Sequence, residues 1–216
     1  MGRRVELSHT IAHGTATYPG LPGPEISDHL TRKSSRARYA PGTEFQIGRI
    51  SMVGNTGTYL DSPFHRYPGG ADLSEVPLDS LADLPGVVVR AGPDLAIGPE
   101  AFEGLEVRGR AVLIHTGWDA RWGTGEYFAD NPHLTADAAA RLAAAGAALV
   151  GIDSVNIDRI EGGERPAHSV LLAKGIPIVE HLTGLSRLPD SGFRFFAVPP
   201  RIRGFGTFPV RAFALV

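Results

Sequence analysis

The 216-residue chain contains no cysteine, and this absence excludes disulfides, thiolate metal ligands and a cysteine nucleophile. It also lacks any apolar stretch close to the ~20 residues that a membrane span needs. The opening residues 1–9 (MGRRVELSH) carry positive charge with no apolar run behind it, so they do not resemble a signal peptide. We therefore expect a cytoplasmic protein with no membrane association.

An excess of one charge is missing as well. The 21 Lys and Arg residues nearly balance the 23 Asp and Glu residues, and the formal net charge is −2. Such a balance disfavours nucleic acid or an anionic membrane as the main partner. The sequence also lacks GxGxxG and GxxxxGK[ST] motifs, so a nucleotide-phosphate loop is not expected. The expected partner is a small-molecule substrate.

Glycine and proline are abundant, with 27 and 17 residues and no repeat period. This composition indicates many turns and a site built from loops. The length suits one domain over residues 1–216. The hydrophobic fraction of 43% is enough for a buried core.

Short strands and short helices intermix along the chain. Apolar patterns predict strands over 5–7, 44–53, 86–90, 110–116, 149–153, 176–180, 193–198 and 210–216, and helices over 78–84, 136–145 and 169–174. Thr135 suits the N-cap of the second helix, and Gly146 suits its end. Because no regular βαβ rhythm is present, the order favours an α/β protein of the α+β kind with a mixed sheet.

Two features precede the polar centre of the chain. Residues 31–39 are rich in Lys and Arg and form either a solvated loop or a clamp for a substrate anion. In the strand over 44–53, the apolar alternation slips by one residue at Gly48, which indicates a β-bulge. Bulges often lie beside functional sites, and an unusual segment follows directly.

Residues 55–65 read NTGTYLDSPFH. If this segment is extended, alternate side chains point to one face. That face carries Asn55, Gly57, Tyr59, Asp61, Pro63 and His65. The end of such a strand can deliver an acid and an imidazole into a pocket. The alternative is that Asp61 caps a turn and that His65 lies on the surface.

A second polar group follows in residues 150–181. Glu180 ends the apolar run IPIVE, which is predicted to be a central strand. A carboxylate there is costly unless it is paired, hydrogen-bonded or bound to a metal. His168 precedes the predicted helix over 169–174 and belongs either to the site or to the cap of that helix. His115, at a strand end, and His181, beside Glu180, could support the site.

The segment 55–65 resembles the signature His-x-Gly-Thr-His-x-Asp-x-Pro-x-His of the cyclase family. This family includes bacterial kynurenine formamidases, isatin hydrolases and polyketide ring cyclases. The resemblance continues through residues 6–20, 77–81, 113–118, 150–154, 168–180 and 208–212, so it covers nearly the whole chain in the right order. It implies the kynurenine-formamidase-like swivelling β/β/α fold with a barrel-like core.

The resemblance also implies roles for individual residues. Asp61, His168 and Glu180 match ligands of a divalent metal, manganese or zinc. His65 matches the residue that transfers a proton. Catalysis would then rest on these four side chains, and we expect Tyr18, Asn55 and Tyr59 to bind the substrate. The family commonly forms homodimers or homotetramers, which is the oligomeric state expected here.

This chain departs from the signature at two positions. Asn55 and Tyr59 stand where the family has its first two histidines. An amide oxygen is a poor ligand for zinc, and a neutral phenol is a weak ligand for any metal. A metal site is therefore open to two alternatives: an ion held more weakly by the remaining ligands, or no ion at all.

Three functions follow. The first is a hydrolase that cleaves an amide, lactam or lactone bond, with His65 as proton carrier and Asp61, His168 and Glu180 as metal ligands or acid–base groups. The second is a metal-independent cyclase or dehydratase for a polyketide-like or aromatic substrate, in which Tyr59 and Asn55 donate hydrogen bonds to an oxyanion. The third is a non-catalytic binding protein with a degenerate site.

Overall fold

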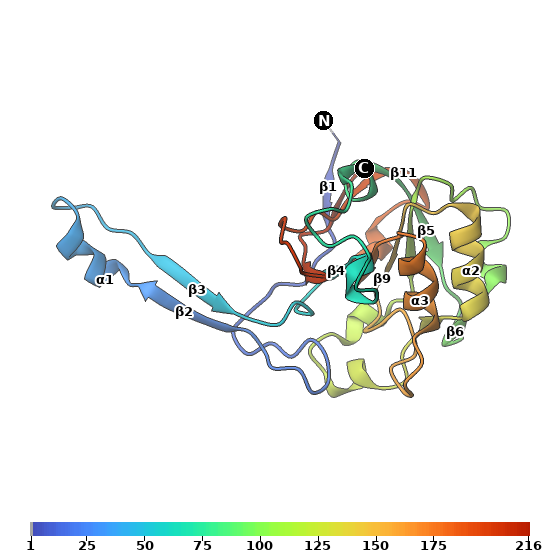
Figure 1. Cartoon of the computed structure of the whole chain (residues 1–216), viewed down its shortest axis with the longest axis horizontal. Helices are drawn as coiled ribbons and strands as arrows, with labels where there is room; N and C mark the ends of the chain where they lie inside the picture. The colour runs from blue at the N-terminus through green and yellow to red at the C-terminus, as the bar shows by residue number, and fades with distance from the viewer. Residues whose placement is uncertain (1) are drawn as a thin grey trace.

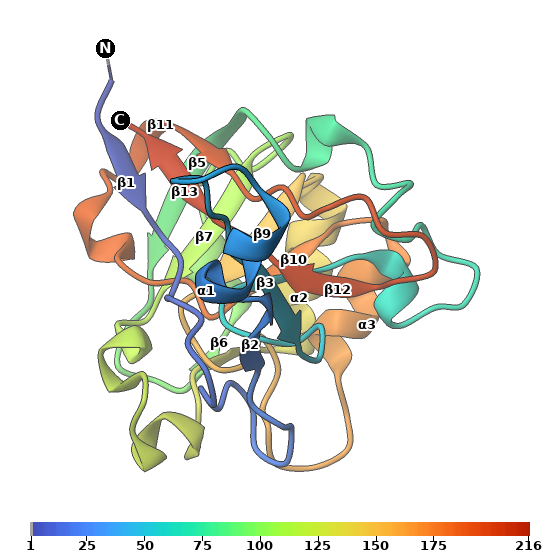
Figure 2. The ribbon, with the colours of Figure 1, turned by 90° about the vertical axis from the view of Figure 1, so that its left-hand side faces the viewer.

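A nine-stranded mixed sheet forms the centre of the molecule, and the computed structural model describes residues 2–216 (Figure 1). The strands lie in the order Arg4–Glu6 (β1), Phe213–Leu215 (β13), Ser191–Phe196 (β11), Leu84–Arg90 (β5), Ala111–His115 (β7), Leu149–Ile152 (β9), Ile178–Glu180 (β10), Tyr59–Asp61 (β4) and Thr207–Pro209 (β12). The four strands from β5 to β10 run parallel, and the flanking pairs run antiparallel. The sheet curls (Figure 2), and the expected mixed sheet of an α+β domain is confirmed.

The two faces of the parallel strands bury separate apolar clusters. Val112 and Ile114 of β7 pack with the helices Ala136–Ala145 (α2) and Pro166–Ala173 (α3), which cover one face. Leu113, between them, points into the cluster on the opposite face. This alternation follows from the two-residue period of a strand. Burial on both faces explains why these strands read as continuous apolar runs.

The predicted helix over 136–145 is confirmed with both of its ends. The Thr135 hydroxyl accepts a hydrogen bond from the Ala138 N–H, and Gly146 ends the helix with φ +81°. The helix predicted over 169–174 begins earlier, at Pro166, so His168 lies in its first turn. The helix predicted over 78–84 was wrong. Only a 3₁₀ turn forms there, at Leu78–Ser80 (η3), and β5 already begins at Leu84.

Other strand predictions need correction at their ends. The stretch 210–216 contains only β13, and β12, just before it, was not predicted. The remaining elements are the strands Ala96–Ile97 (β6) and His133–Leu134 (β8) and the 3₁₀ turns Pro63–His65 (η2), Pro99–Phe102 (η4), Trp118–Arg121 (η5), Gly125–Phe128 (η6) and Leu185–Arg187 (η7). Within residues 2–216, no helix combines the length and apolarity that crossing a membrane requires.

A two-stranded arm projects from the body (Figures 1 and 2). It pairs Glu25–Leu30 (β2) with Ile47–Ser51 (β3), and its tip carries the helix Arg32–Ser35 (α1) and the turn Arg36–Arg38 (η1). The strand predicted over 44–53 is therefore shorter. The register does shift next to Gly48, but the extra residue lies in the partner strand β2, between Asp28 and Leu30. The irregularity and the basic segment lie in the arm, so neither borders the cavity described next.

Candidate active site

A cavity of about 760 Å³ lies where β4, β10 and α3 meet. Tyr59 of β4, Glu180 of β10 and His168 of α3 form part of its wall. Further wall residues, among them Tyr18, Leu21, Asn55, His65, Arg66, Asn156, Glu164 and Arg165, come from loops and 3₁₀ turns. The three residues expected to bind substrate thus all border one cavity, which is large enough for a small aromatic molecule.

The segment 55–65 is extended only at Tyr59–Asp61, which corrects the predicted strand. Gly57 has φ +66°, a left-handed conformation that breaks the alternation. Beyond β4, Pro63 opens the 3₁₀ turn η2, which carries His65 back toward the cavity. The His65 Nδ1 lies 3.7 Å from Asp61 Oδ1. A helical turn rather than a strand therefore brings this histidine beside the acid.

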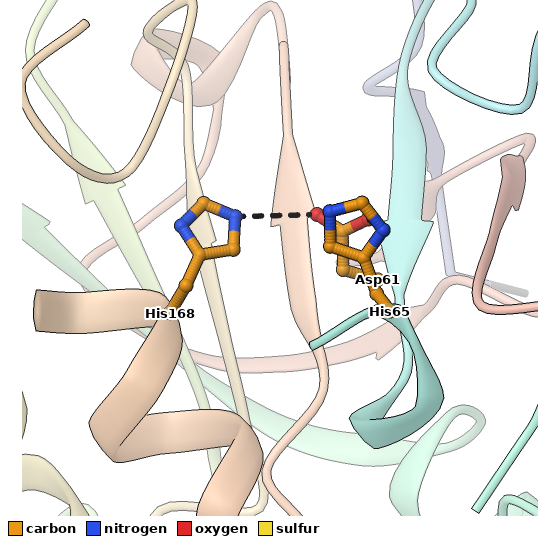
Figure 3. Close-up of side chains that lie close together, drawn as sticks. All are labelled: Asp61, His65 and His168. Atoms are coloured by element: carbon orange, nitrogen blue, oxygen red, sulfur yellow. Dashed lines mark ion pairs between the residues drawn. The ribbon is translucent and has the colours of Figure 1, made fainter. Parts of the chain in front are cut away.

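His168 faces the two buried carboxylates of the sheet. Its Nε2 lies 3.5 Å from Asp61 Oδ2 and 3.5 Å from Glu180 Oε1, and Figure 3 shows the ring pointing across to Asp61 and His65. Asp61 Oδ2 is buried and has no hydrogen-bond partner among residues 2–216. The structure thus brings Asp61, His65, His168 and Glu180 together at one point.

Asp158 orients His168, and sequence reasoning gave it no role. Its carboxylate accepts hydrogen bonds from the Ala167 N–H at 2.7 Å, from the His168 N–H at 3.1 Å and from His168 Nδ1 at 2.6 Å. Two of these bonds cap the start of α3, and the third turns Nε2 toward Asp61. Asp158 lies 10 positions before His168, and Glu161 and Glu164 lie closer to the start of the helix, so no local pattern singled it out.

Glu180 is held by two short hydrogen bonds. Its Oε1 accepts the Ile157 N–H at 2.6 Å, and its Oε2 accepts the Tyr59 hydroxyl at 2.6 Å. Tyr59 lies directly opposite Glu180 in the β4–β10 register. Tyr59 is fully buried, and this burial, with the nearby Glu180 and Asp61, raises the pKa of its phenol well above its ordinary value. The phenol therefore stays protonated and serves as a donor.

Burial and mutual attraction set the charges of the cluster. Burial opposes the charge of His168, but Glu180, Asp158 and Asp61 outweigh it and raise the pKa of His168 to about 10. Burial, together with Asp61, raises the pKa of Glu180 to about 7 against the attraction of His168. Burial opposes the charge of Asp61, but attraction by His65 and His168 and the hydrogen bond from Thr207 outweigh it and lower the pKa of Asp61. Near neutral pH, the cluster thus pairs a charged imidazolium with an ionised Asp61.

Thr207 is a second residue that sequence reasoning missed. It lies opposite Asp61 in the β4–β12 register and is 4% exposed. Its hydroxyl donates a hydrogen bond to Asp61 Oδ1 and lies 2.7 Å from His65 Nδ1. Thr207 is 146 positions from Asp61, so no local pattern connects the two.

The donor set of the cluster is compatible with a divalent metal. Asp61, His65 and His168 each offer one ligand atom, and these atoms lie within 4.8 Å of one another. Two imidazoles and a carboxylate are common ligands of zinc and manganese. The unpartnered Asp61 Oδ2 and the carboxylate that holds His168 Nδ1 match the way metal-binding histidines are supported. The predicted ligand set had Glu180 in place of His65.

The two histidines that were expected to support the site, His181 and His115, occupy different surroundings. His181 is fully buried, and its Nδ1 lies 2.8 Å from the Tyr127 hydroxyl. Burial and the nearby His9 lower its pKa to about 3, so it stays neutral. Its ring contacts Tyr59, with centroids 5.1 Å apart. His115 lies 3.9 Å from Asp153, away from the wall of the cavity.

A curled mixed sheet with a carboxylate–histidine cluster at a cavity defines an enzyme class: one that works on small molecules and can hold a metal. The family model Cyclase matches residues 5–159. The chain belongs to the cyclase family, as the signature segment indicated, and it is an enzyme of that family. The alternative of a non-catalytic binding protein is therefore not supported.

Relatives of known activity extend over almost the whole chain. A kynurenine formamidase of Bacillus mycoides is 27% identical over 210 residues, covering 96% of this chain and 95% of the relative. A kynurenine formamidase of Salinibacter ruber is 28% identical over 213 residues, again covering 96% and 95%. The similarity therefore includes the C-terminal residues that supply His168, Glu180 and Thr207.

Solved structures share the same fold. Isatin hydrolase A from Labrenzia aggregata superposes with a TM-score of 0.84 at 23% identity, covering 99% of this chain and 93% of that chain. A structure described as a potential metal-dependent hydrolase with cyclase activity gives a TM-score of 0.78 at 25% identity, covering 99% and 98%. The expected kynurenine-formamidase-like fold is confirmed.

Proposed function

We propose that this enzyme hydrolyses an amide, lactam or lactone bond of a small, often aromatic, substrate. The observation that carries the proposal is the cluster of Asp61, His65, His168 and Glu180, of which the last three line one cavity of about 760 Å³. The curated relatives are kynurenine formamidases, and formamide cleavage is amide hydrolysis. Both lines of support point to the same class of bond.

Asp61, His168 and Glu180 would hold a divalent ion, manganese or zinc. When bound, the ion supplies Lewis acidity toward the carbonyl group of the substrate. Asp158 fixes the His168 ring so that Nε2 faces both carboxylates. Asp61 contributes the buried oxygen that has no other partner among the described residues.

His65 would carry the proton. It is the exposed member of the cluster and borders the cavity, so it can reach the water and the leaving group of a bound substrate. Tyr18, Asn55 and Tyr59 would contact the substrate from the cavity wall. The scissile bond would then lie near the buried carboxylates.

The experiment is a matched assay with three bond types. Purified enzyme is incubated with aryl formamides, lactams and aryl lactones after chelation and then after adding back manganese or zinc, and bound metal is measured by elemental analysis. We expect turnover of at least one substrate that is lost on chelation and restored by metal. An enzyme that stays fully active without metal would overturn the metal-dependent version.

One observation favours a second candidate, a metal-independent cyclase or dehydratase. Tyr59 stands at a position where the family has a histidine, and its hydroxyl already occupies Glu180 Oε2 at 2.6 Å. In this version, His65 and Glu180 act as base and acid, and the pKa of about 7 for Glu180 suits an acid at neutral pH. The double variant Asn55→His, Tyr59→His should then gain metal binding and lose activity. Unchanged behaviour would contradict this candidate.

We also propose a homodimer or homotetramer assembled through the β2–β3 arm. A two-stranded hairpin is marginally stable by itself, and Ile26, Ile47 and Ile50 of the arm are 44–48% exposed. Burying them against a second copy would stabilise the arm. Light scattering should give a mass of two or four chains, and Ile26→Ser with Ile50→Ser should reduce it. A monomeric parent protein would rule the assembly out.

A cytoplasmic location also remains a proposal. It is supported by a chain that lacks cysteine, which suits a compartment where disulfides do not form. Cell fractionation with detection of the native chain would check it.

A further inference from the structure

The hydroxyl of Thr207 lies between the two side chains of the cluster that differ most in exposure. Asp61 is fully buried, and the His65 side chain is 36% exposed. The β4–β12 register places Thr207 opposite Asp61. From there, its Oγ1 hydrogen-bonds to Asp61 Oδ1 and lies 2.7 Å from His65 Nδ1. Asp61 and His65 themselves are 3.7 Å apart, too far for a direct hydrogen bond.

The direction of these two bonds follows from proton counting. An ionised carboxylate can only accept hydrogen bonds, and a hydroxyl has one proton to donate. The Thr207 proton therefore goes to Asp61 Oδ1. The lone pair of the hydroxyl remains for His65, so Nδ1 of His65 must carry the proton of that bond. A neutral imidazole has only one N–H, and Nε2 is left as its basic nitrogen.

We propose that Thr207 is a positioning residue that holds His65 in the Nδ1–H tautomer and leaves Nε2 free to accept a proton in the cavity. This inference rests on the proposed role of His65 as proton carrier. The wall of the cavity, as far as residues 2–216 form it, does not include Thr207. Thr207 therefore acts through His65 rather than on the substrate.

The backbone next to Thr207 packs closely against the segment that carries His65. The Gly206 carbonyl accepts the Ser62 N–H at 2.7 Å, which ties the start of β12 to the chain entering η2. A Cβ at position 206 would lie 2.5 Å from the His65 backbone nitrogen, so only glycine permits this approach. These two contacts of Gly206 hold the start of β12, and with it Thr207, close to His65.

The tautomer of His65 can be read directly without turnover. Metal-free protein labelled with ¹⁵N-histidine is studied by long-range ¹H–¹⁵N NMR, and His65 is assigned from the spectrum of His65→Gln. We expect the parent protein to show His65 as the Nδ1–H form. In Thr207→Val, which keeps the shape and removes the hydroxyl, the population should move toward the Nε2–H form. Thr207→Ser should restore the parent pattern.

Kinetics at saturating metal give the second readout. Thr207→Val should lower kcat by about 10- to 100-fold, the usual effect of losing an outer hydrogen-bond partner, while KM stays unchanged because the cavity wall is intact. Thr207→Ser should remain close to the parent enzyme in both constants. An unchanged kcat in Thr207→Val would overturn the proposal.

The two proposals fail in different ways. Finding His65 as the Nε2–H tautomer in the parent protein would refute the role of Thr207 even if the enzyme is an active hydrolase, and it would do so even if Thr207→Val does not fold. Conversely, an Nδ1–H tautomer in a protein that cleaves none of the three bond types would leave the positioning intact and refute the hydrolase.

Discussion

The Tyr59–Glu180 pair and the Asp61–His168 pair belong to one cluster but differ in how their polar atoms are satisfied. Both oxygens of Glu180 accept short hydrogen bonds, from Tyr59 and from the Ile157 N–H. Asp61 Oδ2, in contrast, has no hydrogen-bond partner in the described chain and lies 3.5 Å from His168 Nε2. A buried unpaired carboxylate oxygen is costly, so the second pair is where a ligand would be stabilised.

This difference concerns Tyr59, one of the two residues at which the sequence departs from the signature that it resembles. Its hydroxyl donates to Glu180 Oε2 in the first pair. The second pair keeps Asp61 and His168, and it has its own support from Asp158 and Thr207. The two sides of the site are thus supported by different residues. Variants of each side should separate their roles.

The largest effect should come from His65→Gln. Removing a proton carrier lowers kcat by roughly 10²- to 10⁴-fold, and steady-state kinetics on the preferred substrate would measure it. Bound metal should stay, because Asp61 and His168 remain. His115 lies outside the cavity wall, so His115→Gln is the control, and its kcat should stay near that of the parent enzyme. Loss of metal together with activity would instead make His65 a ligand.

Asp158→Asn should have the next largest effect, because it replaces the carboxylate that orients His168. Metal affinity, measured by competition with a chromogenic chelator, should fall by about 10- to 100-fold. Asp153→Asn is the matched control: Asp153 is also buried and accepts backbone N–H bonds, but from Thr116 and Gly117. Equal losses of affinity in both variants would mean that general destabilisation, not orientation, is responsible.

The elements whose signals are local were the ones that the sequence predicted well. Thr135 and Gly146 each mark an end of α2 through their own cap contacts. β2 and β12 escaped prediction because neither shows apolar alternation. β12 contains only Thr207–Pro209, and the six residues of β2 include Asp28 and His29.

The site followed the same rule. Glu180 could be singled out because an acid at the end of an apolar strand needs a reason, and Asp61 because alternation placed it on one face of segment 55–65. His65 and His168 were also candidates from their positions, and the signature resemblance then gave them roles. Thr207 and Asp158 could not be found, because their roles come from pairing with residues that only the folded chain brings close. The extended geometry assumed for 55–65 was wrong because Gly57 and Pro63 break the strand on either side of β4.

Tyr59→Phe distinguishes the two candidate functions with a smaller effect. It leaves Glu180 Oε2 buried without its donor, which should cost about 1–3 kcal/mol of unfolding free energy. In the metal-dependent hydrolase, kcat should change little. In the metal-independent version, kcat should fall by roughly 10²- to 10³-fold, because an oxyanion donor is lost. Tyr127→Phe, whose hydroxyl pairs with His181 instead, is the control for loss of a buried phenol.

The most gradual effect is the pH dependence of stability in the metal-free protein. His168 has its pKa raised from an ordinary value of 6.5 to about 10. The folded state therefore binds this proton more tightly than the unfolded state does, and the resulting stability is present below pH 6.5 and lost as the pH rises through 10. The pKa of Glu180 is raised from 4.5 to about 7, so stability also falls as the pH rises from 4.5 to 7.

Stability should be measured above pH 7. The lowered pKa values of His9 and His181 make stability rise with pH, but only below pH 6.5. Urea unfolding between pH 7 and 9 should show the unfolding free energy falling by about 2–3 kcal/mol. His168→Gln should flatten this slope. With zinc or manganese present the slope should weaken or reverse, because the metal binds the deprotonated imidazole and its affinity grows with pH. A slope that is identical with and without metal would show that the Asp61–His168 pair holds no ion.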